Sequence, residues 1–195
     1  MNVWNNESLI KVLKEDSVVV MPTDTLYGIV GRARNISVVD RIYELRKRAL
    51  QKPCIILIGS IDELEKFSII LSAEQKTALK KYWPAEAPAS AGPPEPTSII
   101  FDCPDDRFSY LHRGTKTLAF RLPASKELRK LVLKTGPLIA PSANMEGELP
   151  AQNIAEAKKY FGDAVDLYVD VGEIKGQASK IIKLQKDGTT QILRP

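Results

Sequence analysis

A short apolar strand stopped by a proline constrains this chain more than any other segment. Residues 18–21 are four apolar residues, three of them valines, and they predict a strand buried in a sheet. Pro22 cannot donate to a strand ladder, so we expect the chain to leave the sheet there and to present Thr23, Asp24, Thr25 and Tyr27 at the strand end. Polar side chains beyond the carboxyl end of a buried strand are where an open α/β sheet binds ligands. The alternative is a turn whose Thr and Asp side chains bond only their own backbone.

The rest of the chain alternates helical and strand patterns. Ser37 resembles a helix cap, and an Asp-Gly pair at residues 187–188 predicts a hairpin, which requires antiparallel pairing. We therefore expect an α/β fold, in which helices pack on a twisted sheet of mixed parallel and antiparallel strands. The expected helices cover residues 8–16, 37–45, 61–67, 72–82, 125–133 and 153–160, and the expected strands cover residues 18–21, 54–58, 97–101, 117–122, 138–140, 167–170, 179–184 and 189–193.

Length and composition indicate one domain outside the membrane. A chain of 195 residues with 44% hydrophobic and 27% charged residues is ordinary for a globular protein with one core, so we expect residues 1–195 to form a single domain. No apolar run approaches the roughly 18–20 residues that span a bilayer, and no signal peptide pattern is present, so we expect a cytoplasmic protein. The Pro/Ala-rich stretch at residues 85–96 predicts an exposed loop.

Motifs that are absent from the sequence argue against several common chemistries. It contains neither the GxxxxGK[ST] pattern nor the GxGxxG pattern of nucleotide-binding loops. Cys54 and Cys103 form no CxxC pair or Cys/His cluster, so we expect reduced thiols and no protein metal site. The single histidine, His112, lies in a polar segment, which disfavours a hydrolase with a Ser-His-Asp or Cys-His site. We expect His112 on the surface.

Positive charge is concentrated soon after the first strand. Seven of the Arg and Lys residues lie between residues 32 and 52, in a chain of net charge +4. Such a cluster favours an anionic partner, either the phosphates of a nucleotide or the backbone of an RNA. The run at residues 46–48 also suits the end of a predicted helix, since the helix dipole explains one or two of these cations without a ligand.

Several segments occur together, in the order known from one family. They are PTDTLYG at 22–28, the basic run at 46–48 with Lys52-Pro53, Trp83-Pro84, Arg-Leu-Pro at 121–123, Pro-Ser-Ala-Asn at 141–144, Ser179 and Leu-Arg-Pro at 193–195. Over nearly its whole length the sequence resembles the threonylcarbamoyl-AMP synthase family, also called Sua5/YciO/YrdC. The resemblance implies a YrdC-like twisted mixed sheet with a basic concave site. The chain departs from the family at Arg46, where a Lys is usual, at Ala49, where Pro is common, and in the stretched join at residues 85–96.

The resemblance implies a nucleotidyltransferase, an L-threonylcarbamoyladenylate synthase. L-threonine and bicarbonate would give N-carboxythreonine, whose carboxylate attacks the α-phosphate of ATP and releases pyrophosphate, with Mg²⁺ accompanying ATP. The product would serve the t6A modification of tRNA through a downstream threonylcarbamoyl-transferase complex. A site made of hydroxyls, amides and cations suits this reaction, because positioning and charge neutralisation carry it with little need for a tuned base.

The resemblance also assigns roles position by position. Arg46 and Arg48 are the expected catalytic residues and, with Lys52, are expected to neutralise phosphate and carbamate charge. The threonine and carbamate positions are Thr23, Thr25 and Arg121, the last as a bidentate partner of the carboxylate. The other ATP-binding positions are Thr97, Ser142, Asn144, Ser179 and Arg194, and no residue is assigned to a metal.

Two other functions stay open from the sequence. One is an RNA-binding YciO-like module that holds tRNA or double-stranded RNA in the same basic concavity and catalyses nothing. The other is carbamoyl transfer from a different carbamoyl donor, as in larger proteins that contain a related domain. The chain shows no acylphosphatase-like or zinc-finger segment, which argues against the second. Dependence of pyrophosphate release on L-threonine would separate the three functions.

Overall fold

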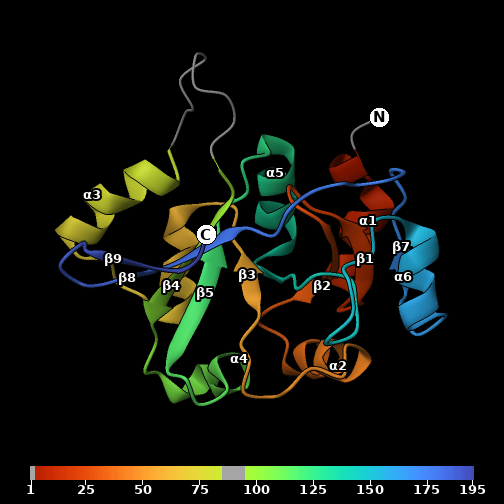
Figure 1. Cartoon of the computed structure of the whole chain (residues 1–195), viewed down its shortest axis with the longest axis horizontal. Helices are drawn as coiled ribbons and strands as arrows, with labels where there is room; N and C mark the ends of the chain where they lie inside the picture. The colour runs from red at the N-terminus through yellow and green to blue at the C-terminus, as the bar shows by residue number, and fades with distance from the viewer. Residues whose placement is uncertain (1–2, 85–94) are drawn as a thin grey trace.

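A sheet of mixed direction forms the centre of the computed structural model, which describes residues 3–84 and 95–195 (Figure 1). Within these residues it has nine strands in the order β7-β1-β2-β6-β3-β5-β4-β8-β9. Parallel pairs such as β3 with β5 occur beside antiparallel pairs such as β4 with β5, so the predicted mixed α/β sheet is confirmed. The strands are β1 (Val19–Pro22), β2 (Tyr27–Arg32), β3 (Ile55–Leu57), β4 (Thr97–Asp102), β5 (Thr117–Arg121), β6 (Leu138–Ile139), β7 (Leu167–Tyr168), β8 (Lys180–Leu184) and β9 (Thr190–Arg194).

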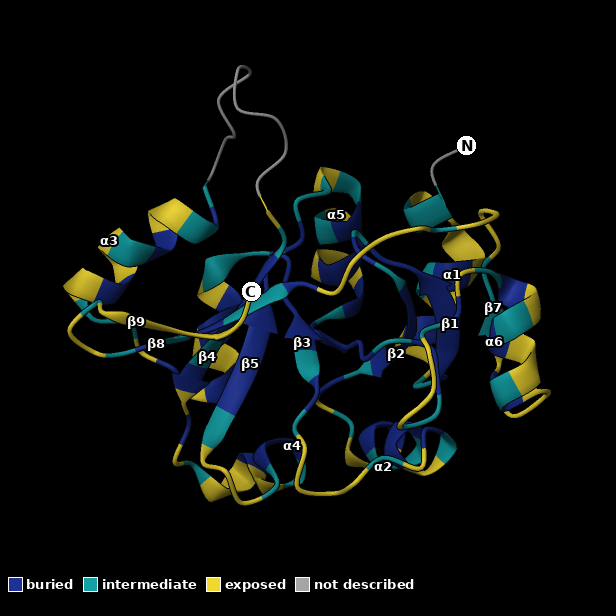
Figure 2. Cartoon of the chain, viewed as in Figure 1, coloured by how far each residue is buried: buried dark blue, intermediate teal, exposed yellow. Residues whose placement is uncertain are grey.

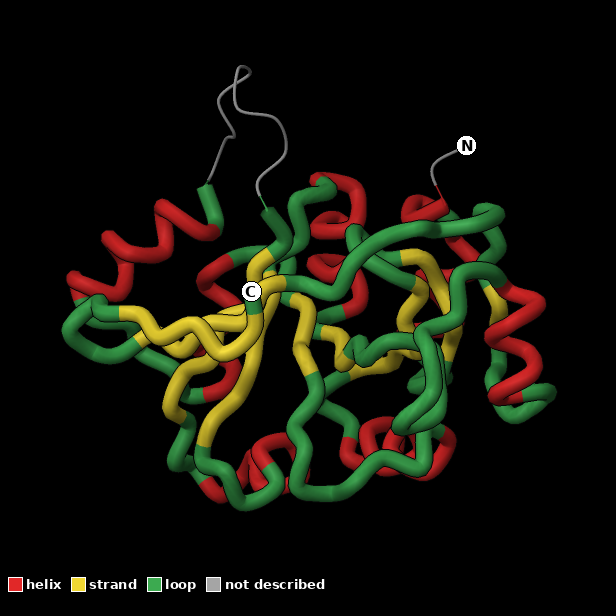
Figure 3. Tube along the Cα trace, viewed as in Figure 1, coloured by secondary structure: helices red, strands yellow, loops and turns green. Residues whose placement is uncertain are grey.

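Helices cover both faces of this sheet, as Figure 3 shows. One apolar core lies between the sheet and helices α1 (Glu7–Lys14) and α5 (Lys126–Thr135). The second core lies on the opposite face (Figure 2). It is covered by α2 (Ile36–Leu45), η2 (Ile61–Phe67), α3 (Ala73–Tyr82), η3 (Asp106–Phe108), α4 (Ser109–His112) and α6 (Ile154–Phe161), while the short η1 (Val3–Asn5) precedes α1.

Strand β1 shows why both faces must be covered. Val20 points into the core under α2, whereas Val19 and Met21 point into the core under α1 and α5. All three side chains are fully buried, and burial of each stabilises the fold by about 1.5–3 kcal/mol. The prediction of a strand buried in the sheet is confirmed.

Strand β2 differs from the sequence prediction, which ended the sheet at Pro22 and had the following glycines serve turns or close approach. The chain instead turns back at once, and β2 pairs antiparallel with β1, with Pro22 opposite Tyr27 at the end of the ladder. Gly31 serves a close approach, because a Cβ there would lie 2.3 Å from Cγ1 of Val38 on α2. Glycines interrupt the apolar pattern of a strand, and this is why β2 is hidden in the sequence.

Two local predictions on the α2 side of the sheet are wrong. His112 is 1% exposed and not on the surface, because α4 packs against the core and turns the ring inward, where Nδ1 accepts the Gly114 N–H at 3.1 Å. Helix α2 is capped by Asn35, whose side chain accepts the Val38 N–H, and not by Ser37. Asn and Ser are equally good caps, so the sequence does not decide between them.

The C-terminal hairpin is confirmed, since β8 and β9 pair antiparallel around Gly188, whose φ is +83°. Cys54 and Cys103 are buried free thiols. The loop predicted at residues 85–96 lies outside the described residues except for its last two positions. No helix in residues 3–84 and 95–195 combines the length and apolar character that crossing a bilayer requires.

Candidate functional site

A cavity of about 290 Å³ lies beside β3, between strand ends that belong to both edges of the sheet. Its wall is formed by the β1–β2 turn, the ends of β5, β6 and β9, and the starts of β3 and β8. Among the described residues its lining contains four arginines and no carboxylate. The predicted positions that meet there are Thr23, Thr25, Arg46, Arg48, Arg121, Ser142, Ser179 and Arg194, whereas Lys52, Thr97 and Asn144 are not part of the lining.

The hydroxyl groups of the two threonines in the β1–β2 turn have different hydrogen-bond partners. The Thr23 hydroxyl donates to Leu26 O at 2.7 Å and accepts the N–H groups of Thr25 and Leu26 at 3.2 Å, so it closes its own turn. The Thr25 hydroxyl lies 3.0 Å from that of Thr23 and lines the cavity. Thr23 therefore stabilises its own turn, as the structural alternative predicts, and ligand binding by the two threonines that line the cavity stays a prediction.

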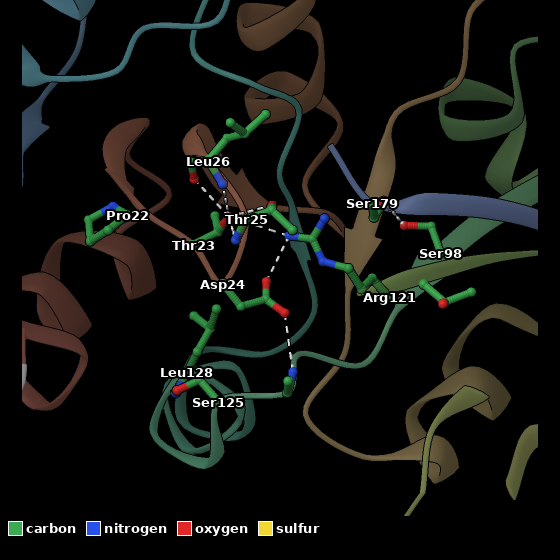
Figure 4. Close-up of polar contacts among 12 residues, drawn as sticks. Pro22, Thr23, Asp24, Thr25, Leu26, Ser98, Arg121, Ser125, Leu128 and Ser179 are labelled. Carbon is green, nitrogen blue, oxygen red and sulfur yellow. Dashed lines mark hydrogen bonds and ion pairs between the residues drawn. The ribbon is translucent and has the colours of Figure 1, made fainter. Parts of the chain in front are cut away.

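Arg121 stands at the end of β5 with its side chain 4% exposed (Figure 4). Its Nη2 lies 3.0 Å from Oδ1 of Asp24 and 3.4 Å from the Thr23 hydroxyl, while Nε is buried without a partner in the described structure. Burial lowers the pKa of Arg121, and the Asp24 carboxylate opposes this. Asp24 is expected at the strand end from the sequence, but no role in the site was assigned to it. Asp24 is the acidic residue of the PTDTLYG segment, but its partner Arg121 lies 97 positions away in the sequence.

Arg46 and the 141–144 segment form one hydrogen-bonded unit. Arg46 follows α2 and is 3% exposed. Its Nε donates to Asn144 O at 2.9 Å, and Nη2 donates to Asn144 Oδ1 at 3.1 Å and to the Ser142 hydroxyl at 3.4 Å. Burial lowers the pKa of Arg46, and the neighbouring Arg48 adds to this. Asn144 thus holds Arg46 in place, and the buried Nη1 has no partner among the described residues.

The loop after Arg46 is tied down on its outer side. Arg48 donates to the backbone carbonyls of Lys52 and Pro53 at 2.9 and 3.1 Å and borders the cavity. The Lys52 ammonium instead pairs with Glu146, which also accepts the Ala49 N–H. Both bonds hold the pKa of the Glu146 carboxyl below its usual range.

The opposite wall carries a serine pair. The Ser179 hydroxyl lies 2.8 Å from the buried Ser98 hydroxyl, and Arg194 donates to Ser179 O from Nε and Nη2 at 3.0 and 2.6 Å. The Thr97 hydroxyl donates to Glu95 O. Neighbouring residues of a strand point to opposite faces, so the side chains of Thr97 and Ser98 cannot both face Ser179. Ser98 is the one that contacts Ser179, whereas the family resemblance had selected Thr97.

A segment that we call the strap, residues 171–178 between β7 and β8, passes over the β1–β2 turn (Figure 1). The Tyr27 hydroxyl donates to Gly172 O at 2.8 Å and accepts the Val171 N–H at 3.0 Å. Gly176 lies so close that a Cβ there would be 1.7 Å from Thr25 O. Tyr27, to which the sequence assigned no binding role, therefore fastens the strap to the PTDTLYG segment.

Tyr27→Phe is expected to lower the free energy of unfolding by about 1–2 kcal/mol, because two hydrogen bonds to the strap are lost from a buried ring. Urea unfolding measures this change, and hydrogen exchange of the Val171 amide should become faster. Tyr160→Phe is the matched control, since that hydroxyl bonds Leu149 O at an exposed position. Unchanged exchange at Val171 would contradict the role given to Tyr27.

Comparisons with known proteins show the family to which this chain belongs. The Sua5/YciO/YrdC family model, described as "Telomere recombination", matches residues 11–195. The Bacillus subtilis threonylcarbamoyl-AMP synthase is 33% identical over 147 residues, which are 74% of this chain and 39% of that protein. A putative threonylcarbamoyl-AMP synthase of Mycobacterium tuberculosis (strain H37Rv) is 28% identical over 188 residues, covering 96% of this chain and 82% of the relative.

Solved structures show the same fold. The Pyrococcus abyssi Sua5 in complex with L-threonine is 26% identical with a TM-score of 0.79, and it covers all of this chain and 55% of its own. The Escherichia coli YciO structure matches with a TM-score of 0.76 at 18% identity. The chain thus spans about half or less of the Pyrococcus and Bacillus relatives and most of the mycobacterial one. With the family model matched from residue 11 to the last residue, the chain belongs to the Sua5/YciO/YrdC family.

Proposed function

We propose that this chain is a nucleotidyltransferase that makes L-threonylcarbamoyl-adenylate from L-threonine, bicarbonate and ATP and releases pyrophosphate. The observation that carries the proposal is a single cavity with two kinds of anion site. Arg121 and Thr25 lie at one end, and Arg46, Arg48 and Ser142 lie at the other. Relatives named threonylcarbamoyl-AMP synthase, and a related Sua5 with bound L-threonine, support the assignment. The product would feed t6A37 modification of tRNA by a downstream transferase complex.

The amino acid is placed at the Arg121 end. The Nε of Arg121 is a donor without a partner among the described residues, and a carboxylate is the acceptor that such a guanidinium binds most strongly. The Thr25 hydroxyl lies on the same wall and can bond the substrate. Holding the amino acid there would orient its carbamate toward the other end, which is the main contribution a positioning site makes to rate.

The nucleotide phosphates are placed at the Arg46 end. Oxygen of the carbamate would form a bond to the α-phosphorus, and the bond to the leaving pyrophosphate would break. Negative charge develops on the phosphate oxygens, and fixed cations such as Arg46 and Arg48 stabilise it without reorganising. The described residues hold no group of three His, Cys, Asp or Glu that could bind a metal, so Mg²⁺ is proposed to arrive on the ATP phosphates.

Pyrophosphate release from ATP is expected to require both L-threonine and bicarbonate. L-serine should support slower release, because one missing methyl in a pocket costs only about 1–3 kcal/mol and discrimination is partial. A coupled pyrophosphate assay with each component omitted in turn measures this. Release that is independent of threonine, or absent under all conditions, would contradict the proposed function.

The same protein preparation tests the RNA-binding alternative. Under the proposed function, ATP competes with tRNA for the cationic end and tRNA binding is weak. A titration of labelled tRNA at two salt concentrations, with and without ATP, measures both effects. Tight binding that ignores ATP would favour the RNA-binding module.

A further inference from the structure

The four arginines of the cavity differ in what balances their charge. Three of them donate to uncharged acceptors: Arg46 to Asn144 and Ser142, Arg48 to two backbone carbonyls, and Arg194 to Ser179 O. In the part of the chain that the structure describes, none of these three has a carboxylate oxygen within 4.0 Å, whereas Arg121 pairs with Asp24.

Asp24 is held by an ion pair with Arg121 and by one hydrogen bond from the backbone (Figure 4). Its side chain is 6% exposed, with Oδ1 3.0 Å from Arg121 Nη2 and Oδ2 accepting the Ala124 N–H at 3.1 Å. Asp24 does not line the cavity but borders a separate groove on the other side of the β1–β2 turn. Its carboxylate therefore sits behind Arg121, where it cancels charge without occupying the ligand's space.

The two ends of the cavity consequently differ in net charge. Among the described residues Arg46 and Arg48 form no ion pair, and the nearby Glu146 carboxylate is paired with Lys52, so this end keeps a net positive charge that favours the polyanionic phosphates of a nucleotide. The Arg121–Asp24 pair has no net charge, but Arg121 keeps a free Nε donor. Asp24 offsets one of the two guanidinium groups at this end, Arg121 and Arg194, so a phosphate dianion is attracted less strongly there than at the Arg46 end, while the directional donor of Arg121 still suits a carboxylate.

We propose that Asp24 is a specificity-determining residue: it neutralises Arg121 so that this end of the cavity accepts the carboxylate of an amino acid and rejects phosphate groups. This inference rests on the proposed function for the identity of the amino acid. The charge argument itself depends on the geometry of the four arginines, so phosphate binding can test it without any turnover.

The test is a titration of inorganic phosphate followed by ³¹P NMR. Asp24→Asn keeps the shape of the side chain and an oxygen for Ala124 N, but it leaves the Arg121 charge uncompensated. It is expected to bind phosphate at least 10-fold more tightly than wild type, in competition with L-threonine. Adding Arg121→Gln to this variant should abolish the gain. Asp40→Asn is the matched control, because it removes the acid of the Asp40–Arg113 pair away from the cavity and should change phosphate affinity less than 2-fold.

Phosphate binding by Asp24→Asn equal to that of wild type would overturn the proposal. If circular dichroism shows that Asp24→Asn does not fold, two other variants decide. Arg48→Gln should weaken phosphate binding at least 10-fold, and the uncharged double variant Asp24→Asn/Arg121→Gln should stay within 2-fold of wild type. A 10-fold loss in the double variant would overturn the proposal, because Arg121 would then already hold phosphate in the wild type. Failure of the wild type to turn over threonine would contradict the proposed function, while the phosphate titrations judge Asp24 separately.

Discussion

Arg46→Ala is expected to lower kcat/KM for ATP by about 10³-fold. The substitution removes a cation from the phosphate end and three hydrogen bonds to Asn144 and Ser142. Hydrogen bonds to charged groups contribute about 1.5–3 kcal/mol each, and a loss of about 4 kcal/mol in the transition state corresponds to three orders of magnitude. Steady-state kinetics of pyrophosphate release with varied ATP measures the effect.

Two further variants separate charge from geometry at this position. Arg46→Lys keeps the cation but not the planar fork that bonds both oxygens of Asn144, so we expect an intermediate loss. Arg41→Ala is the control, since Arg41 lies on α2, the helix that Arg46 follows, but pairs with Asp166 at a partly exposed site. A folded Arg46→Ala protein whose kcat/KM stays within 10-fold of wild type would show that Arg46 is only structural.

The parts of the fold that were predictable from sequence are those set by local pattern. The apolar run ending at Pro22 and the hairpin around Gly188 depend on neighbouring residues, and both predictions are confirmed. Strand β2 was missed because its glycines are required by a distant contact between Gly31 and Val38. His112 was misplaced for a similar reason, since its burial follows from how α4 packs and not from its polar neighbours.

The candidate site follows the same division. The resemblance to a family gathered most of the hydroxyls and arginines that the cavity brings together. The role of Asp24 was missed because it depends on Arg121, which only the folded sheet brings within 3.0 Å. Which residues of β4 face Ser179 is set by the pairing of β4 with β5 and β8, and the sequence does not reveal this pairing. Thr97 was therefore selected, and its neighbour Ser98 was missed.

Gly176→Ala is expected to lower kcat/KM for L-threonine by about 10²-fold with little loss of stability. A Cβ at this position would lie 1.7 Å from Thr25 O and 2.8 Å from Thr25 C, and neither backbone atom can move without changing the turn. The strap must therefore shift and take with it Ala178 and Ser179, which line the cavity. A displacement of about 1 Å in a positioning site is enough to cost two orders of magnitude in rate.

The expected signature of Gly176→Ala is a separation between activity and folding. Residues of the strap are largely exposed, so its displacement removes little buried apolar surface, and thermal unfolding should change by only a few degrees. Lys175→Ala is the control, because its exposed ammonium pairs with Glu173 at 3.4 Å on the surface and both the kinetics and the melting temperature should stay near wild type. A Gly176→Ala protein with wild-type kinetics would show that the strap does not set the position of Thr25 and would refute this prediction.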